Sequence, residues 1–273
     1  MTSPASLIDD VAAEQAALEA VVRGLPETAW ATPTFAAGWD VRDHIAHLAF
    51  FDDMAALAIV DAAGFANEVA LALSGIDAYE ARWLARGRAL DVPALLAWWR
   101  RARAALRDAA RALPPKGQLP WYGPPMSPAT FLTARLMETW SHGQDVVDAT
   151  GRHREDSDRL RHVATLGVRT RGFSYRVRGK EPPADPVRVE LVLPSGAAWT
   201  DGLEEASSRI SGTARDFCLV VTQRRHVEDT ALVVHGGAAA EWMRLAQAFA
   251  GPPGAGRPPG LFPKSADGGR ARP

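Results

Sequence analysis

The spacing of apolar residues predicts helices through the first half of the chain. In residues 6–25 apolar side chains recur at helical intervals, although Glu14 and Gln15 interrupt this stripe. A second helix is predicted to begin near Asp40, because a long stripe of apolar residues at the same spacing follows it. Stripes of this length indicate that each helix buries one face against its neighbours.

Two further long helices complete this helical part. Residues 62–90 are Ala-rich and predict shorter helical pieces, whereas residues 92–113 predict a strongly amphipathic helix. The Pro-rich loop at residues 114–126 is long enough to act as a lid or a binding loop. Ser127 and Pro128 then provide the N-cap and first-turn signals of the next helix. Four long helices in sequence predict a four-helix bundle.

The second part of the chain has a different pattern. A helix is predicted over residues 158–173, and apolar residues then alternate through residues 186–199, which is typical of two strands joined by a turn. The remaining predicted elements are three strands, at Ser208 to Gly212, Phe217 to Val221 and Ala231 to Val234, and a helix at Ala238 to Phe249. The expected fold class is therefore α plus α+β, with a helical bundle followed by a smaller domain that contains a small sheet.

This change of pattern places the domain boundaries. Gly151 and the charged run that follows it predict that the helical bundle occupies residues 1–155 and the α+β domain residues 156–251. Residues 252–273 are rich in Pro and Gly, so we expect them to form an extended or disordered tail.

Composition narrows the classes of function. With 273 residues, 47% hydrophobic residues and a formal net charge of −1, the chain is typical of a globular protein without an overall basic field. No apolar run reaches the length of a membrane-spanning helix, and the N-terminus lacks the features of a signal peptide. We therefore expect a cytoplasmic location and a small-molecule substrate, with no nucleic-acid or membrane partner, while the oligomeric state stays open.

Cys218 is the single cysteine of the chain. This excludes an intrachain disulfide and a multi-cysteine zinc site, and it fits a reducing compartment. The apolar, strand-like surroundings of Cys218 favour a buried core thiol over a nucleophile. A metal site in this chain would therefore rely on histidine and carboxylate ligands.

The helix that begins at Pro128 carries the most informative pair of residues. Glu138 and His142 are four residues apart, so their side chains lie on one face of the helix, about 40° apart around its axis. A carboxylate beside an imidazole can form half of a metal site or an acid–base pair. An ordinary hydrogen bond on the helix surface is the alternative, and the pair by itself does not decide between them.

Two histidines of the helix after Asp40 are candidates to complete a metal site. His47 lies in an apolar stretch and is predicted to point toward the core, as a ligand or as a hydrogen-bonded core histidine. His44, three residues earlier, is the competing ligand. Asp145, three residues after His142, could orient that imidazole or be a solvated helix residue. Two histidines and one glutamate suit zinc, nickel, iron and manganese alike.

Two motifs carry a resemblance to a known family. Residues 38–49, GWDVRDHIAHLA, resemble the N-terminal motif of the DinB-like metal-binding bundles. Residues 138–151, ETWSHGQDVVDATG, resemble the second motif of the mycothiol-dependent maleylpyruvate isomerase branch. The resemblance implies a DinB-like four-helix bundle up to about residue 150. It also implies that His47, Glu138 and His142 bind a divalent metal, usually zinc.

The same resemblance carries expectations for the second domain. Family members of this architecture add a C-terminal domain similar to the sterol-carrier type, in which an arginine can hold the substrate carboxylate. Arg224 and Arg225 are the candidates for this catalytic role, and solvated loop arginines are the alternative. Residues 211–218 and 246–254 resemble a subfamily described only as metal-binding, which leaves the substrate open.

Three functional hypotheses follow. In the leading one, the metal activates a low-molecular-weight thiol, mycothiol by resemblance, for addition to a small electrophilic, carboxylated substrate, giving isomerisation or S-transfer. In the second, water or the substrate itself occupies the open position in a thiol-independent hydrolase, lyase or cyclase. In the third, the chain is a non-catalytic metal- and ligand-binding protein, and a fourth protein ligand such as His44 closes the site.

Overall fold

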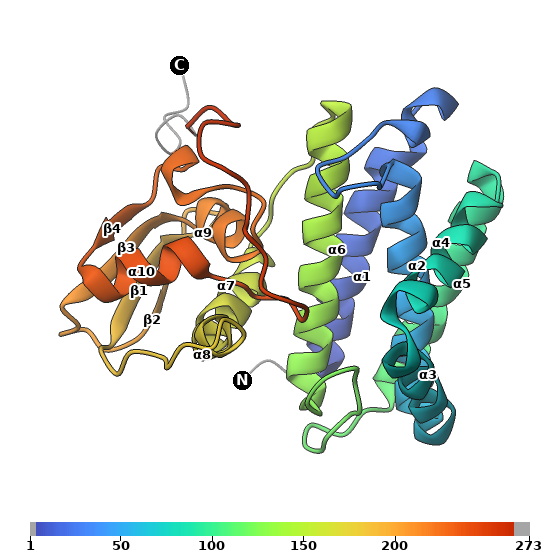
Figure 1. The fold of residues 1–273 in the computed structure, drawn as a ribbon, viewed down its shortest axis with the longest axis horizontal. Coiled ribbons are helices and arrows are strands. Elements are labelled where there is room, and N and C mark those ends of the chain that lie inside the picture. Colours follow the sequence, from blue (N-terminus) through green and yellow to red (C-terminus); the bar gives the residue numbers. More distant parts are fainter. Residues whose placement is uncertain (1–3, 265–273) are drawn as a thin grey trace. The chain divides into compact units, whose positions relative to one another are not determined.

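Among the described residues, the strands of the sheet all lie in the second part of the chain, whereas helices occur in both parts (Figure 1). The computed structural model describes residues 4–264 and divides into two compact units, the first ending at Glu155 and the second beginning at Asp156. The first unit is built from helices, and the second combines helices with a four-stranded sheet. The predicted fold class, a helical domain followed by a smaller α+β domain, is confirmed.

Four long helices form the bundle of the first unit. They are α1 (Pro4–Arg23), α2 (Val41–Val60), α5 (Val92–Arg111) and α6 (Pro128–Thr150). α2 packs against α5 and α6, and α1 packs against the same two helices, which closes the ring of contacts expected of a four-helix bundle. The shorter elements of this unit are α3 (Ala62–Ser74) and α4 (Ile76–Arg88), which lie against α2, and the 3-10 helix η1 (Glu27–Ala31).

Capping residues fix the start of α2 and of α6. The Asp40 carboxylate accepts a hydrogen bond from the Asp43 backbone N–H at 3.0 Å, and the Asp43 carboxylate accepts one from the Asp40 N–H at 3.1 Å. At α6 the Ser127 hydroxyl accepts from the Thr130 N–H at 3.2 Å, and a proline occupies the first turn, as predicted. Gly151 ends α6 with a φ of 62°, in the left-handed conformation.

The two polar residues within the apolar stripe of α1 are buried with it. Gln15 donates from Nε2 to Oδ2 of Asp52 on α2 at 2.9 Å. Oε1 of Glu14 lies 3.4 Å from Nη1 of Arg154. Each side chain has a polar or charged partner that compensates for the loss of water, so α1 keeps a continuous buried face despite the interruption in its sequence pattern.

The sheet of the second unit has the strand order β2-β1-β3-β4. Its strands are β1 (Val187–Val192), β2 (Ala198–Asp201), β3 (Ser208–Thr213) and β4 (Val233–His235). β1 pairs antiparallel with β2 and parallel with β3, and β3 pairs antiparallel with β4. The helices of this unit are α7 (Leu160–Arg169), α8 (Arg171–Arg176), α9 (Ala214–Val221) and α10 (Gly237–Leu245), with the 3-10 helix η2 (Val227–Asp229). α9 and α10 both pack against β3.

One predicted strand is wrong, because Phe217 to Val221 lie in helix α9. Thr213 is the N-cap of this helix, and its hydroxyl accepts a hydrogen bond from the Asp216 N–H at 3.0 Å. The short apolar run by itself cannot distinguish a buried strand from a buried helix. Cys218 is buried within α9, so the predicted core thiol is confirmed, but in a helix rather than a strand.

The segment that follows α10 is attached to the second unit by hydrogen bonds. α10 ends at Leu245, earlier than the predicted helix. Residues 252–264 contain neither helix nor strand, and Nη2 of Arg178 donates to the Gly254 carbonyl at 2.7 Å. Residues 265–273, the rest of the predicted tail, lie outside the described residues. The described part of the tail therefore packs onto the unit.

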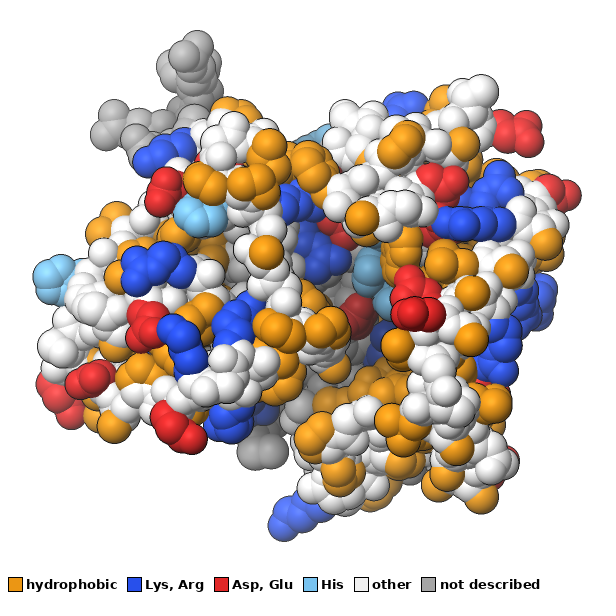
Figure 2. Space-filling model, viewed as in Figure 1, with side chains coloured by type: hydrophobic (Ala, Val, Ile, Leu, Met, Phe, Trp, Pro, Cys, Tyr) orange, Lys and Arg blue, Asp and Glu red, His pale blue; other side chains and the backbone are white. Residues whose placement is uncertain are grey.

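Neither the hydropathy of the described helices nor the surface charge seen in Figure 2 points to one particular class of partner. No helix between residues 4 and 264 combines the length and the apolar character needed to cross a membrane. In the view of Figure 2, basic and acidic side chains both occur on each unit, so neither unit presents a uniformly charged face in this view.

Candidate metal centre

The loop before α2 brings two side chains to the site. Its ends are joined by an isolated antiparallel bridge between Pro33 and Asp40. Gly38 adopts a φ of 78°, a left-handed conformation that favours glycine and lets the chain turn back. The turn holds Thr34 against Trp39, since the Thr34 N–H donates to the Trp39 carbonyl at 2.9 Å.

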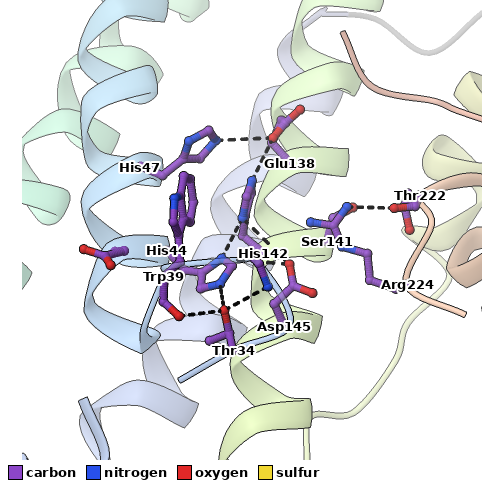
Figure 3. A network of polar contacts seen from close by, with 12 residues as sticks. Thr34, Trp39, His44, His47, Glu138, Ser141, His142, Asp145, Thr222 and Arg224 are labelled. Carbon is purple, nitrogen blue, oxygen red and sulfur yellow. Dashed lines mark hydrogen bonds and ion pairs between the residues drawn. The ribbon is translucent and has the colours of Figure 1, made fainter. Parts of the chain in front are cut away.

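The structure brings together the three residues that the resemblance implies as ligands (Figure 3). His47 lies on α2, whereas Glu138 and His142 lie on α6. Oε2 of Glu138 is 3.4 Å from Nε2 of His47 and 3.2 Å from Nε2 of His142. One possible ligand atom from each residue lies within 4.8 Å of the other two. Two helices that are distant in the sequence therefore converge on one point.

The separations between these atoms fit a divalent metal. Both ring nitrogens of His47 are buried and make no hydrogen bond of good geometry to a described residue, although Nε2 lies 3.4 Å from Oε2 of Glu138. Two ligand atoms about 2.1 Å from one ion, at a tetrahedral angle, lie about 3.4 Å apart. The distances of 3.4 Å and 3.2 Å to Glu138 match this spacing. Two imidazoles and a carboxylate are a donor set that binds zinc and other first-row ions.

Electrostatics favour a neutral imidazole beside an ionised carboxylate. Burial, together with the neighbouring His142, lowers the pKa of His47 to about 3. Burial by itself would raise the pKa of Glu138, but the imidazoles of His142 and His47 lower that pKa well below its usual value. A neutral His47 and an anionic Glu138 are the protonation states that metal ligation requires.

Aromatic rings surround the two imidazoles. The Trp39 indole stacks on the His142 ring, with centroids 5.9 Å apart and an interplanar angle of 18°. The rings of Phe51 and Trp83 lie against His47, with centroid distances of 4.6 Å and 5.4 Å. These contacts restrict the orientation of both imidazoles and make the surroundings of the site largely apolar.

His44 and Asp145 form a second group around His142. Nδ1 of His44 lies 2.8 Å from Nδ1 of His142, and Oδ2 of Asp145 lies 3.9 Å from each of these nitrogens. The three residues are close enough to hold a metal. However, 2.8 Å is the length of a hydrogen bond and is shorter than the spacing of about 3.4 Å between two ligands of a tetrahedral ion. His44 thus contacts the side of the His142 ring that faces away from Glu138.

Two polar residues near the site were missed by sequence reasoning. Oγ1 of Thr34 lies 2.8 Å from Nε2 of His44, and Arg135 is buried beside Asp52. Arg135 precedes Glu138 by three residues, so helical spacing could have placed both on one face. Nothing local marks Thr34, because its contact depends on how the loop folds back.

Arg224 and Arg225 lie in the turn after α9, in the second unit. Nη1 of Arg224 donates to the Thr222 carbonyl at 2.7 Å, and the Arg225 guanidinium lies 3.4 Å from the centroid of the Phe262 ring. Arg225 also lines a small pocket together with Arg244 and Arg257. Three guanidinium groups at one pocket suit an anionic group. The catalytic role of either arginine stays a prediction.

Two family models match the chain. A model described as the mycothiol maleylpyruvate isomerase N-terminal domain matches residues 11–147. The family resemblance carried by the two sequence motifs is thereby confirmed. A second model, described as wyosine base formation, matches residues 183–235, which include all four strands. The likeness of the second domain to a sterol-carrier domain stays a prediction.

Relatives cover almost the whole chain. Two Mycobacterium tuberculosis proteins, from strains CDC 1551 and H37Rv, are each 43% identical over 257 residues, covering 94% of this chain and 100% of the relative. Both are described as uncharacterized proteins. The crystal structure of the mycothiol-dependent maleylpyruvate isomerase matches with a TM-score of 0.51 at 16% identity, and that of its histidine-to-alanine mutant with 0.52 at 15%. Each match covers 82% of this chain and 92% of the other, and at such identities it establishes the fold alone.

Proposed function

This chain belongs to the family of the mycothiol maleylpyruvate isomerase N-terminal domain, and on that basis we propose that it is a divalent-metal-dependent enzyme. In the proposed reaction, mycothiol adds to a small electrophilic, carboxylated substrate, with isomerisation or S-transfer as the outcome. The observation that carries the proposal is the convergence of His47, Glu138 and His142, with both ring nitrogens of His47 buried and without a well-formed hydrogen bond to any described residue.

Zinc is the proposed metal, with nickel, iron or manganese as the alternatives that the same donor set accepts. Nε2 of His47, Nε2 of His142 and Oε2 of Glu138 would hold it. A divalent ion bound there would lower the pKa of a bound thiol, so that the nucleophilic thiolate is present near neutral pH. Two neutral imidazoles and one carboxylate carry a single negative charge. With a divalent ion bound, the site would keep a net positive charge, which favours an anionic thiolate.

The number of protein ligands supports a catalytic rather than a structural metal. Structural zinc sites are closed by four protein ligands, whereas catalytic sites keep an open position. Among residues 4–264, the group around Glu138 contains only His47 and His142 as further ligands. His44, the residue considered for closing the site, directs Nδ1 to His142 and Nε2 to Thr34.

The aromatic rings would exclude water and hold the ligands in place. Trp39 stacks on His142, and Phe51 and Trp83 pack against His47. In such apolar surroundings each charge interaction is stronger than it would be in water. The chain would thus supply a partly buried, aromatic-lined environment that orients the ligands of a reactive thiolate.

For the carboxylate of the substrate we favour Arg225, with Arg224 as the second candidate. The support is the small basic pocket that Arg225 lines in the second unit. Replacing Arg225 by Gln should raise KM for an acidic substrate much more than it lowers kcat, while Arg225→Lys should retain part of the affinity. An unchanged KM in Arg225→Gln would exclude this assignment, and Arg224→Gln would then be measured in the same way.

The first experiment is metal content by elemental mass spectrometry after reconstitution with zinc. We expect near one equivalent in the wild type and its loss in His47→Ala, Glu138→Gln and His142→Ala. His153→Ala is the matched control, because the His153 side chain is 78% exposed and contacts Glu155. Folding of each variant is checked by circular dichroism. A wild type that binds no metal would exclude the proposed site.

The second experiment tests the thiol. Turnover of maleylpyruvate and of related unsaturated acids is measured with and without mycothiol. The proposal expects saturable dependence on the thiol and no turnover in Glu138→Gln. Equal rates without any thiol, with solvent oxygen appearing in the product, would favour a thiol-independent hydrolase instead.

A further inference from the structure

Two buried polar side chains fix the path of residues 251–262, which we call the C-terminal segment. Near its start, Nε2 of Gln247 donates to the Pro252 carbonyl at 3.1 Å. Near its end, the Asp229 carboxylate accepts a hydrogen bond from the Gly260 N–H at 2.7 Å. Gln247 and Asp229 are only 1% and 4% exposed, so the hydrogen bonds that hold this segment are shielded from water. The C-terminal segment is therefore a built part of the second unit.

The same segment brings an aromatic ring against two arginines. Cζ of Arg225, in the turn after α9, lies 3.4 Å from the centroid of the Phe262 ring, and Cζ of Arg257 lies 5.1 Å from it. A guanidinium group at such a distance is attracted to the face of the ring, most strongly where water is excluded. Arg257 is itself only 8% exposed. Phe262 therefore holds a guanidinium of the C-terminal segment near a guanidinium of the turn after α9.

These two arginines line a small cavity. Arg244 of α10 and Gly256 of the C-terminal segment line it as well. Gly256 has a φ of 68°, a left-handed conformation that favours glycine, so it allows the segment to turn at the cavity. The cavity volume is about 20 Å³, which is room for one water-sized group. The cavity can therefore receive one oxygen atom of a ligand, but not a ring or an alkyl chain.

The residues around the cavity determine which charge that oxygen should carry. Arginine stays protonated throughout the pH range in which proteins are folded, so all three guanidinium groups at the cavity are positive. None of the described residues that line the cavity is acidic. Guanidinium N–H groups form charge-assisted hydrogen bonds whose planar geometry matches carboxylate and phosphate oxygens. The cavity thus suits an oxygen of a terminal oxyanion group.

We infer that the C-terminal segment completes an oxyanion-binding site in the second unit. In this site Arg257 binds the carboxylate or phosphate group of a ligand together with Arg225 and Arg244. The site requires neither a metal nor a thiol. Only the identification of this oxyanion with the carboxylate of the substrate rests on the proposed function. The segment after α10 thereby gains a direct part in binding, beyond its packing onto the unit.

The first test detects the anion at the three side chains. The full chain, labelled with 15N-arginine, is titrated with inorganic phosphate and, separately, with acetate at constant ionic strength. The Nε–H signals of Arg225, Arg244 and Arg257 are identified by their loss in the corresponding lysine variants. We expect the three signals to shift together and to saturate at millimolar anion. Tighter binding of phosphate would indicate a phosphorylated ligand, and tighter binding of acetate a carboxylated one.

Variants of Arg257 separate the site from its surroundings. Arg257→Gln should weaken phosphate binding about 10- to 100-fold, because a charge-assisted hydrogen bond is lost. Arg257→Lys keeps the charge without the planar fork, so it should weaken binding less. The matched control is Arg209→Gln, because the Arg209 side chain is 38% exposed, pairs with Glu190 and does not line the cavity. This control should stay within about twofold of the wild type.

Three results would overturn the inference. The first is the absence of a saturable shift with either anion, and the second is wild-type phosphate affinity in Arg257→Gln. The third is an equal loss of affinity in Arg209→Gln, which would mean that phosphate is attracted only by the general positive charge. If Arg257→Gln does not fold, the Arg257 signal of the wild type and the variant Arg244→Gln, at an exposed position, still decide the question.

The proposed function and this inference fail in different experiments. Loss of phosphate binding in Arg257→Gln, together with an unchanged KM in Arg225→Gln, would reject the substrate role of Arg225 and leave the oxyanion site in place. The reverse combination is an increased KM in Arg225→Gln with phosphate binding that Arg257→Gln does not change. That combination would refute the inference and leave the proposed function standing.

Discussion

Nη2 of Arg135 on α6 lies 2.9 Å from Oδ1 of Asp52 on α2, and both side chains are buried. Nε of Arg135 donates to the same oxygen at 3.1 Å, and Gln15 of α1 donates to Oδ2 of Asp52. Burial raises the pKa of Asp52, and the Arg135 guanidinium partly offsets that rise. The ion pair joins the two helices that carry His47 and Glu138, so it constrains the distance between those ligands.

Loss of this ion pair should destabilise the first unit. Asp52→Asn leaves the Arg135 charge buried without a counter-ion, so we expect a loss of about 3–5 kcal/mol in the free energy of unfolding, measured with urea. The control is Asp108→Asn, because the Asp108 side chain is 68% exposed and its removal should cost less than about 0.5 kcal/mol. The double variant Asp52→Leu with Arg135→Met should recover much of the loss. An Asp52→Asn protein as stable as Asp108→Asn would contradict this account.

The metal-free protein should lose stability as the pH falls, and His47 should account for part of that loss. Its pKa is about 3 in the folded protein, against an ordinary value of 6.5. The unfolded chain therefore binds more protons between these values, and the free energy of unfolding decreases as pH falls through this window. In the presence of a chelator, the stability of wild type relative to His47→Gln should decrease from about pH 7 to about pH 5. A difference that stays constant, or that grows at low pH, would exclude the assigned pKa.

Close packing of α4 on α2 should make Gly87 intolerant of a side chain. A Cβ added at Gly87 would lie 2.3 Å from Cβ of Ala46, and both positions are on helices that cannot easily move apart. We expect Gly87→Ala to cost about 1–3 kcal/mol of unfolding free energy. Gly237→Ala is the matched control, because no atom lies within 4 Å of its added Cβ. Equal stability of the two variants would show that α2 and α4 adjust at little cost.

Cys218 should be unreactive in the folded protein. It is buried in α9, and burial raises the pKa of its thiol well above the usual value. Modification by a thiol-specific chromogenic reagent should therefore follow unfolding, with a rate that rises with urea concentration. The matched control is Cys218→Ser, which should give no signal. Rapid stoichiometric labelling in native buffer would show that the thiol is accessible.

Much of the fold follows from the sequence, because periodicity and caps are local signals. The long helices of the bundle and the start of α6 at Ser127 were predicted from these patterns. The run from Phe217 to Val221 is apolar at every position, so it has no alternation of apolar and polar residues that could distinguish a helix from a strand. This is why the strand prediction is wrong there. The N-cap at Thr213, followed three residues later by Asp216, is the local signal that identifies this segment as a helix.

The site was less predictable, because its details depend on contacts between distant parts of the chain. His47, Glu138 and His142 were chosen as a set from motifs, and the structure brings their ligand atoms together. The place of His44 could not be predicted, since it depends on a hydrogen bond to a residue on another helix and on the turn that presents Thr34. Residue spacing predicts which side chains are neighbours on one helix. It does not predict which nitrogen of an imidazole ring contacts a residue on another helix or loop.

The position of the ligands along the chain also bears on biosynthesis. His47 lies on α2, whereas Glu138 and His142 follow only on α6, the last helix of the bundle. A ribosome therefore releases the first ligand well before the other two, and no emerging part of the chain can assemble the complete group until α6 has left the exit tunnel. The complete ligand set would accordingly become available only late in synthesis, after most of the bundle has been made.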